Sequence, residues 1–233
     1  MPLPEIEVQR RIAAHLKAHL AEVDEARQAA ESQLRDSAML ADALVQEGIR
    51  CERPTRHVLG DVLTEVKKGI GGGWADYPVL GATRDGLAPA KEPPGKTPER
   101  YKPVIPGTVF YNPMRILIGS IALVDEGNAP GITSPDYVVL RGHEDKVDTR
   151  WFYHWLRSPV GERCILSLAR GAVRERMLFN RLAEGEIDLP SLPAQKRVSA
   201  ALSSLGPMRD AVQQQLAEIN RLPQKLLAQA FET

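Results

Sequence analysis

Apolar side chains recur at helical spacing through the first fifty residues, and no Gly or Pro lies between Glu5 and Glu47. Their alternating intervals of four and three residues are typical of an imperfect heptad seam, interrupted at Arg27 and Ser37. The seam positions are Ile12, Leu16, Leu20, Val23, Ala30, Leu34, Ala41 and Leu44. We expect a helix of about 60 Å that ends at Gly48. Such a helix cannot bury its own stripe, so the pattern also predicts a partner helix.

The opening of this predicted helix recurs near the other end of the chain. The segment LPEIEVQRRIAAHL at 3–16 corresponds to LPSLPAQKRVSAAL at 189–202, which lies 186 positions later. The second copy carries its own apolar stripe at Leu205, Val212, Leu216, Ile219, Leu226 and Leu227. It supplies the predicted partner helix. We expect Gly206–Pro207 and Pro223 to break or kink this helix.

The residues between the two copies have a different pattern, with frequent Gly and Pro and short β-prone runs. These runs are 79–80, 108–111, 116–118, 121–124 and 137–140, followed by a predicted short helix with an aromatic face at 149–156. The sequence therefore predicts an α+β protein with a long helix at 1–50, one mixed α/β domain at 51–188 and a second helix at 189–233. We expect this domain to be set between the two long helices, which pair through their apolar stripes.

The chain has 233 residues and equal numbers of acidic and basic side chains, 30 of each. Its 43% apolar content excludes a disordered chain. No uncharged run approaches the roughly 20 residues of a membrane span, and no signal peptide is visible, so we expect a cytoplasmic protein. The two cysteines, Cys51 and Cys164, are far apart and lack neighbours at ligand spacing, so we predict neither a metal site nor a cofactor.

The neutral total conceals two basic segments. Residues 67–115 hold 8 bases against 4 acids, and residues 163–181 hold five Arg against Glu175 alone. Residues 1–50 and 125–162 are net acidic, each by three charges. If the two basic segments share a face, they form a positive patch suited to a polyanion such as DNA. The alternative is solvated surface charge.

Two short motifs resemble catalytic ones. Asp136, Glu144 and Lys146 have the letters of a nuclease site that holds Mg²⁺ on two carboxylates. However, residues 142–145 are typical of a polar turn rather than a strand. The segment Asn112–Pro113–Met114–Arg115 partly matches the motif of amino-methyltransferases, but it lacks the second Pro and the aromatic residue. No glycine-rich cofactor loop follows a predicted strand, so we expect no catalytic residue in this chain.

Taken together, several motifs resemble the DNA specificity subunit of type I restriction-modification systems, in a half-length form with one target-recognition domain. The motifs are the twice-used Leu-Pro-x-x-x-x-Gln-Arg/Lys-Arg opening, the segment 111–120, the segment 133–139, and 170–176 leading into 187–190. The resemblance implies that full-length members of the family contain two recognition domains alternating with two conserved helices. It also implies that the two helices of this chain form an antiparallel coiled coil or helix bundle. The resemblance implies a subunit that directs methyltransferase and restriction subunits to a bipartite DNA site. Cleavage and methyl transfer are then expected on those other subunits.

The resemblance also implies the partners of this chain. They are double-stranded DNA, the methyltransferase subunit, the restriction subunit through the complex, and a second copy of the chain as a homodimer, with no membrane partner. Arginine pairs with guanine, asparagine with adenine, and lysine with phosphate. The candidate DNA-binding residues are Lys67, Lys68, Trp74, Arg84, Lys91, Lys96, Arg100, Tyr101, Lys102, Tyr111, Asn112, Arg115, Arg170, Arg174, Arg176 and Asn180. For Tyr111, burial in the domain core is an equal alternative. Two other functions remain open: a metal-dependent nuclease, and a coiled-coil scaffold that does not bind DNA.

Overall fold

The structure is a computed structural model that describes residues 5–51, 53–169 and 176–232, with the backbone alone at 230–232. The chain divides into two compact units. Residues 1–41 and 203–233 form the helical unit, and residues 42–202 form the mixed unit. Helices α1 (Ile6–Arg50) and α5 (Leu192–Ile219) contribute residues to both units, and α6 (Leu222–Glu232) belongs to the helical unit.

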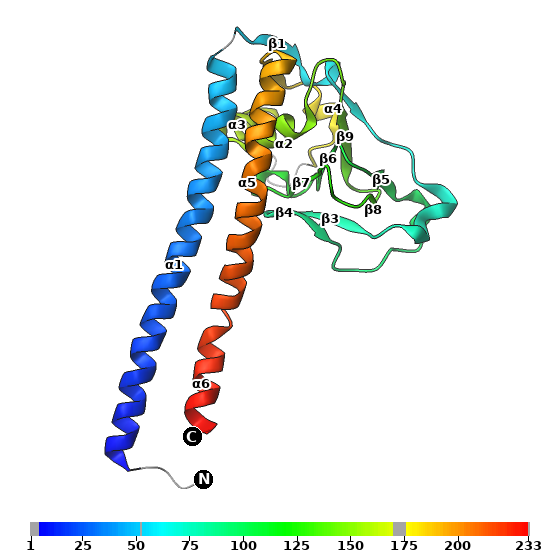
Figure 1. Ribbon diagram of the computed structural model, residues 1–233. Helices are drawn as coiled ribbons and strands as arrows, with labels where there is room; N and C mark the ends of the chain where they lie inside the picture. The colour runs from blue at the N-terminus through cyan, green and yellow to red at the C-terminus, as the bar shows by residue number, and fades with distance from the viewer. Residues whose placement is uncertain (1–4, 52, 170–175, 233) are drawn as a thin grey trace. The chain divides into compact units, whose positions relative to one another are not determined.

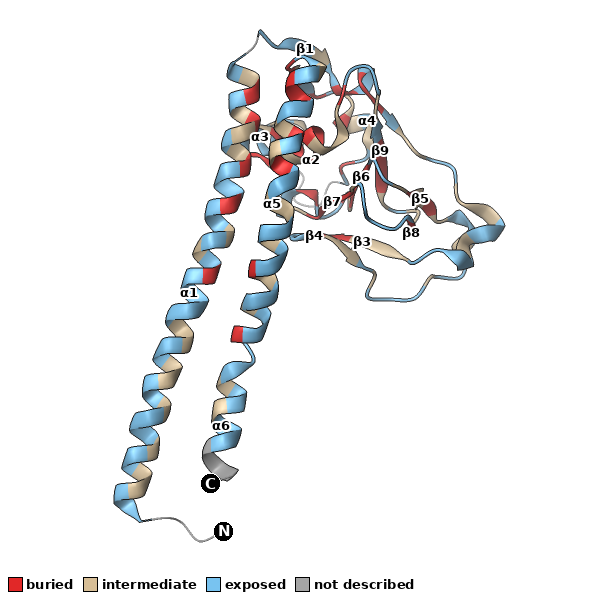
Figure 2. Ribbon diagram, in the orientation of Figure 1, coloured by how far each residue is buried: buried red, intermediate tan, exposed pale blue. Residues whose placement is uncertain are grey.

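In the helical unit, α1 runs beside α5 in the opposite direction (Figure 1). Ala30, Val212 and Ile219 are buried between them, and Val23 and Leu216 pack against this cluster. The buried positions of α1 lie on the side that faces α5 (Figure 2). The predicted antiparallel helix pair is therefore confirmed. The repeat is also visible in the helix starts, because Ile6 of α1 corresponds to Leu192 of α5.

The predicted end of the first helix was wrong. Helix α1 continues through Gly48 to Arg50. Gly48 is buried, and a Cβ at this position would lie 2.9 Å from Cγ2 of Val198. The glycine therefore permits a close helix approach within the mixed unit instead of ending the helix. The seam also differs from the prediction at two positions. Ser37 is buried although the sequence predicted an interruption there, and Val45 is buried in place of the predicted Leu44.

Of the break or kink predicted at Gly206–Pro207, the break was wrong. Helix α5 passes through Pro207 without ending, although proline removes one backbone donor. The interruption occurs at Asn220 and Arg221, immediately before Leu222. Pro223 then lies in the first turn of α6, where its missing N–H has no helical partner to lose.

The mixed unit is built on a four-stranded antiparallel sheet with the order β2–β9–β6–β7. Its strands are β2 (Leu63–Glu65), β6 (Thr108–Tyr111), β7 (Ile121–Val124) and β9 (Val138–Gly142). Phe110 lies opposite Ala122 on one side and Val139 on the other, and all three are fully buried. The predicted strands at 108–111 and 121–124 match β6 and β7, and the α+β class is confirmed.

Three two-stranded antiparallel pairs surround this sheet. They are β1 (Thr55–Val58) with β10 (Glu186–Leu189), β3 (Leu80–Thr83) with β4 (Gly86–Pro89), and β5 (Lys102–Val104) with β8 (Gly131–Thr133). The helices α3 (Pro159–Leu168) and α4 (Phe179–Leu182) follow β9 in the chain. The strand predicted at 116–118 was wrong. These residues form one 3₁₀ turn, in which only Ile116 is buried.

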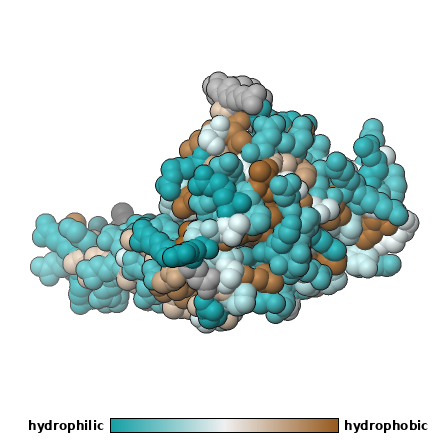
Figure 3. All heavy atoms as spheres, turned by 90° about the horizontal axis from the view of Figure 1, so that it is seen from above, coloured by the Kyte–Doolittle hydropathy of each residue, from teal (hydrophilic) through white to brown (hydrophobic). Residues whose placement is uncertain are grey.

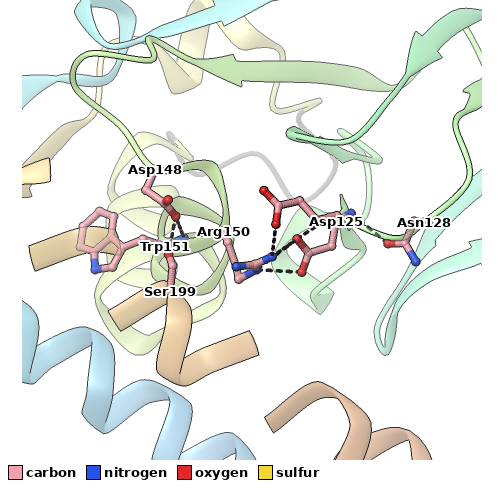
Figure 4. Close-up of polar contacts among 7 residues, drawn as sticks. Asp125, Asn128, Asp148, Arg150, Trp151 and Ser199 are labelled. Atoms are coloured by element: carbon pink, nitrogen blue, oxygen red, sulfur yellow. Dashed lines mark hydrogen bonds and ion pairs between the residues drawn. The ribbon is translucent and has the colours of Figure 1, made fainter. Parts of the chain in front are cut away.

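The predicted aromatic helix is α2 (Thr149–Arg157). Asp148 caps its first turn, because the Asp148 carboxylate accepts a hydrogen bond from the backbone N–H of Trp151 at 3.0 Å. The same carboxylate accepts a hydrogen bond from the Ser199 hydroxyl on α5 (Figure 4). The buried Gln195 adds a second tie, since its side-chain oxygen accepts from the Asp148 N–H at 2.9 Å. The second copy of the repeat thus holds the start of α2.

An ion pair fixes the other side of α2. The Arg150 guanidinium donates to the carboxylate of Asp125 at 2.8 Å, just after β7 (Figure 4). The Asn128 side chain completes the turn by accepting from the Asp125 N–H at 2.9 Å. Both charged side chains are half-buried, and the bidentate geometry favours this pair. Helix α2 is therefore held to the edge strand of the sheet as well as to α5.

Candidate nucleic-acid interface

A groove of about 860 Å³ crosses the mixed unit beside the β3–β4 hairpin and the segment between β6 and β7. Five of its lining residues are candidate DNA-binding residues: Arg84, Lys91, Tyr101, Asn112 and Arg115. Its charged side chains are three bases and one acid, Glu92. The groove is also lined by the exposed apolar residues Met114 and Ile118. Hydrophobic residues lie among mostly hydrophilic ones on the face of the molecule that Figure 3 shows. The groove combines positive charge with exposed apolar groups, which suits a nucleic acid.

Arg84 stands at the tip of the β3–β4 hairpin. The Thr83 hydroxyl fixes this tip by donating to the Gly86 carbonyl at 3.0 Å and accepting from the Asp85 N–H at 3.2 Å. Gly86 has a φ of +114°, which a residue with a side chain rarely adopts. The Ser120 hydroxyl donates to the Ala82 carbonyl at 2.6 Å and joins the hairpin to the start of β7. Arg84 is exposed, and these hydrogen bonds hold the backbone of the hairpin that carries it in place.

The second wall of the groove is the turn between β6 and β7, residues 112–119, which we call the 112–119 turn. The side-chain oxygen of Asn112 accepts from the backbone N–H of Met114 at 3.0 Å. Ile116 is buried and anchors the turn, and Gly119 closes it with a φ of +82°. Asn112 therefore supports the turn itself, while Arg115 is exposed.

Arg157 joins the hairpin tip to the 112–119 turn, and sequence reasoning missed it. Its guanidinium donates to the backbone carbonyls of Gly119 and Ile121, each at 3.1 Å, and to that of Arg84 at 2.6 Å. The guanidinium also lies 5.4 Å from the centre of the Tyr153 ring. One signal was available, because Arg157 closes the predicted aromatic helix. However, Arg157 belongs to the net acidic segment 125–162, so a count of basic segments does not identify it.

Two candidate residues belong to the core instead of the surface. Tyr111 is 0% exposed, and burial raises the pKa of its hydroxyl well above the ordinary value. Lys102 is 9% exposed, and its ammonium donates to the Tyr137 carbonyl at 2.7 Å and lies 3.7 Å from the Glu65 carboxylate. Burial lowers the pKa of Lys102, and Glu65 opposes that shift. Burial of these two side chains argues against direct DNA contacts by Tyr111 and Lys102.

The other candidates that the structure describes do not line the groove. Lys67 is exposed and lies 3.7 Å from Glu65. Lys68, Lys96, Arg100 and Asn180 are exposed on other segments, and Trp74 is half-buried. Arg170 and Arg174 lie outside the described residues.

The two basic segments do approach each other where both are described. The backbone N–H of Met177 donates to the Pro113 carbonyl at 3.0 Å, so the segment after residue 175 touches the 112–119 turn. Arg176, next to Met177, forms an ion pair with Asp136 at 3.1 Å. The Tyr101 hydroxyl accepts from the Gly95 N–H at 2.9 Å and holds the loop before β5.

The residues of the nuclease alternative are widely separated. Asp136 precedes β9 and Glu144 follows it, and this five-residue strand spans about 16 Å. Asp136 pairs with Arg176, and the Lys146 ammonium donates to the Asp61 carbonyl at 3.3 Å. Within the described residues, no three His, Cys, Asp or Glu side chains gather at a distance that would hold a metal ion. The geometry therefore disfavours this alternative.

No helix in the described part of the chain combines the length and apolar character of a membrane span. No family model matches the sequence. The chain is 28% identical over 125 residues to the specificity subunit of the type I restriction enzyme EcoBI from Escherichia coli. That match covers 49% of this chain and 25% of the subunit, so this chain spans about a quarter of the curated relative.

Two solved structures have a similar fold. One is the S subunit of a type I restriction-modification system from M. genitalium, with a TM-score of 0.59 and 14% identity, covering 97% of this chain and 61% of that one. The other comes from work on the assembly and conformational transition of a type I system, with a TM-score of 0.59 and 21% identity over 99% of this chain and 60% of that one. This chain thus resembles the specificity subunits of type I restriction-modification systems, in sequence over part of its length and in fold over nearly all of it.

Proposed function

We propose that this chain is the DNA-recognition subunit of a type I restriction-modification complex and has no catalytic activity of its own. The observation that carries this proposal is the groove in the mixed unit, which is lined by three bases, Arg84, Lys91 and Arg115, and by one acid, Glu92. In this account residues 51–188 are the target-recognition domain. Residues 1–50 and 189–233 are the conserved helices that hold it.

The groove supplies the two kinds of contact that sequence-specific binding needs. Exposed Arg and Lys side chains neutralise phosphates and position the domain, and this contribution does not depend on sequence. Groups that reach base edges select the sequence. Arg84 on the β3–β4 hairpin and Arg115 on the 112–119 turn both line the groove, so a DNA backbone following the groove meets both side chains.

The second part of the proposal concerns assembly. One recognition domain accounts for half of a bipartite site, so we propose that a second copy of the chain supplies the other half. A homodimer with two-fold symmetry then recognises a palindromic site. The long helices set the separation of the two halves, since a helix of about 60 Å spans several base pairs. The methyltransferase and restriction subunits carry the chemistry in this account.

A binding experiment tests the proposal. The purified chain is mixed with a random-sequence duplex, alone and with the methyltransferase subunit from the same restriction-modification system, and binding is followed by fluorescence anisotropy. We expect salt-dependent binding that strengthens in the complex. A chain that binds no duplex in either form is a helical scaffold and contradicts the proposal. Mg²⁺-dependent cleavage by the chain alone, abolished in Asp136→Ala, contradicts its non-catalytic part.

The dimer has a separate test. Light scattering at micromolar protein gives the mass of the particle, and the proposal predicts twice the 25.7 kDa of one chain. A strictly monomeric mass at micromolar protein contradicts the homodimer.

A further inference from the structure

Three large apolar side chains project from the 112–119 turn. Met114 and Ile118 are each 65% exposed and Leu117 is 46% exposed, although Ile116 between them is buried. Exposing this much apolar surface in one short segment is unfavourable in water. Grouped exposed apolar side chains of this kind mark sites of interaction.

The turn holds these side chains in fixed positions. Within it, the Arg115 N–H donates to the Asn112 carbonyl at 2.9 Å and the Gly119 N–H to the Ile116 carbonyl at 2.9 Å. Outside it, Arg157 binds the Gly119 carbonyl, and the Met177 N–H binds the Pro113 carbonyl. The apolar groups are therefore presented in advance, and little conformational entropy is lost when a partner binds them.

The neighbours of the turn indicate what the partner is. Ile118 and Arg84 line both the groove described above and a second groove of about 620 Å³, so they form the ridge between the two. Met114 and Arg115 lie on the first groove beside that ridge. Cationic side chains therefore stand next to each apolar one. A partner that fits this ridge carries negative charge and an apolar group within one side chain's reach.

Double-stranded DNA meets this description in its major groove. The floor of that groove is polar except for one apolar substituent, the 5-methyl group of thymine. We propose that Met114 and Ile118 contact thymine 5-methyl groups while Arg84 and Arg115 hold the flanking phosphates. The 112–119 turn is then a specificity-determining element. This inference rests on the proposed function and deepens it.

The experiment begins with the wild-type chain bound to its methyltransferase subunit. A preferred duplex is selected from a random-sequence pool, and each thymine in it is replaced in turn by uracil, which lacks only the methyl group. We expect a loss of about fourfold in affinity at one or two positions, the value of one buried carbon group. In Ile118→Ala or Met114→Ala, the same replacement should have no effect at the position that residue contacts.

A matched control variant is Met39→Ala, because Met39 is also an exposed apolar residue, 69% exposed on α1. It should keep the wild-type response to uracil. The salt dependence of binding should be the same in all four proteins, because no charge is removed. Thermal unfolding of each variant confirms that the exposed substitutions leave the fold intact.

The possible results separate this inference from the proposed function. Two results contradict the methyl contact without touching the proposed function. In one, the wild-type protein binds its selected duplex with equal affinity after every uracil replacement, and in the other it selects a site without thymine. Loss of the methyltransferase subunit from Ile118→Ala during co-purification, with DNA preference unchanged, assigns the turn to a protein contact and also contradicts it. Absence of any duplex binding by the wild-type complex contradicts the proposed function itself.

Discussion

Arg157 donates a hydrogen bond from its guanidinium to the backbone carbonyl of Arg84 at 2.6 Å, so one arginine positions the other. The same guanidinium binds the Gly119 carbonyl at the end of the 112–119 turn. A single side chain from α2 therefore sets the relative position of the hairpin tip and the 112–119 turn. Charge-assisted hydrogen bonds of this kind are among the stronger ones in proteins.

Arg157→Ala should loosen both walls of the groove. Three backbone carbonyls lose a charged donor, and we expect the free energy of unfolding to fall by about 1–3 kcal/mol. Hydrogen exchange followed by mass spectrometry should show faster exchange in peptides that cover residues 112–120. Arg141→Ala, which removes an exposed arginine from β9, serves as the control and should leave this exchange unchanged. Equal protection of residues 112–120 in both variants contradicts the positioning role of Arg157.

Lys91 and Lys102 are both DNA-binding candidates by sequence, but they differ in exposure. Lys91 is exposed and lines the groove, whereas Lys102 is buried against Glu65 and Tyr137. Lys91→Met should lower the slope of log affinity against log salt concentration by about 0.9, the value of one phosphate contact. Lys102→Met should leave the slope unchanged. A reduced slope in Lys102→Met shows that its ammonium reaches DNA, contrary to its position here.

Lys102 should also give stability a pH dependence. Burial lowers its pKa in the folded chain below the ordinary 10.5. Between the folded pKa and that value, the unfolded chain binds more protons, so stability should rise with pH in that window. Denaturant unfolding at a series of alkaline pH values measures the rise, and Lys102→Met should reduce it. An identical pH profile for the two proteins argues against a perturbed lysine.

Tyr111→Phe distinguishes a core residue from a DNA contact. The Tyr111 hydroxyl is buried and has no hydrogen-bond partner among the described residues. Removing it eliminates the cost of an unsatisfied buried group, so the free energy of unfolding should stay the same or rise by about 1–2 kcal/mol. Duplex affinity should not change. A clear loss of affinity without loss of stability restores Tyr111 as a binding residue.

The sequence predicted the elements that depend on local pattern. The repeat placed the starts of two helices, and the β-prone runs at 108–111 and 121–124 matched strands residue for residue. It failed where tertiary contacts decide. Gly48 lies inside a helix, where the close approach of Val198 leaves no room for a side chain. The three apolar residues Ile116–Ile118 are compatible with a strand or with a turn, and the fold makes them a turn. Such choices depend on partners far away in the chain.

The candidate site shows the same division. Charge counting located Arg84, Lys91 and Arg115 in one segment, and the fold placed them on one groove. Charge alone could not separate Lys102 from them, because its burial depends on Glu65 in β2 and on Tyr137 just before β9. Nor could it find Ile118 or Arg157, since their roles come from the shape of a turn and the direction of a helix. Residue type predicted the chemistry, and only the fold determined the exposure.

The salt dependence of duplex binding tests most directly whether the groove binds the DNA backbone. The variant with Arg84, Lys91 and Arg115 all replaced by Ala is compared with one in which the exposed α1 residues Arg11, Lys17 and Arg35 are replaced by Ala. Both variants have three fewer positive charges than the wild type. We predict that the slope of log affinity against log salt falls by about 0.9 for each phosphate that the groove variant no longer neutralises, and stays at the wild-type value in the helix variant. Equal slopes in the two variants would contradict the assignment of this groove to DNA.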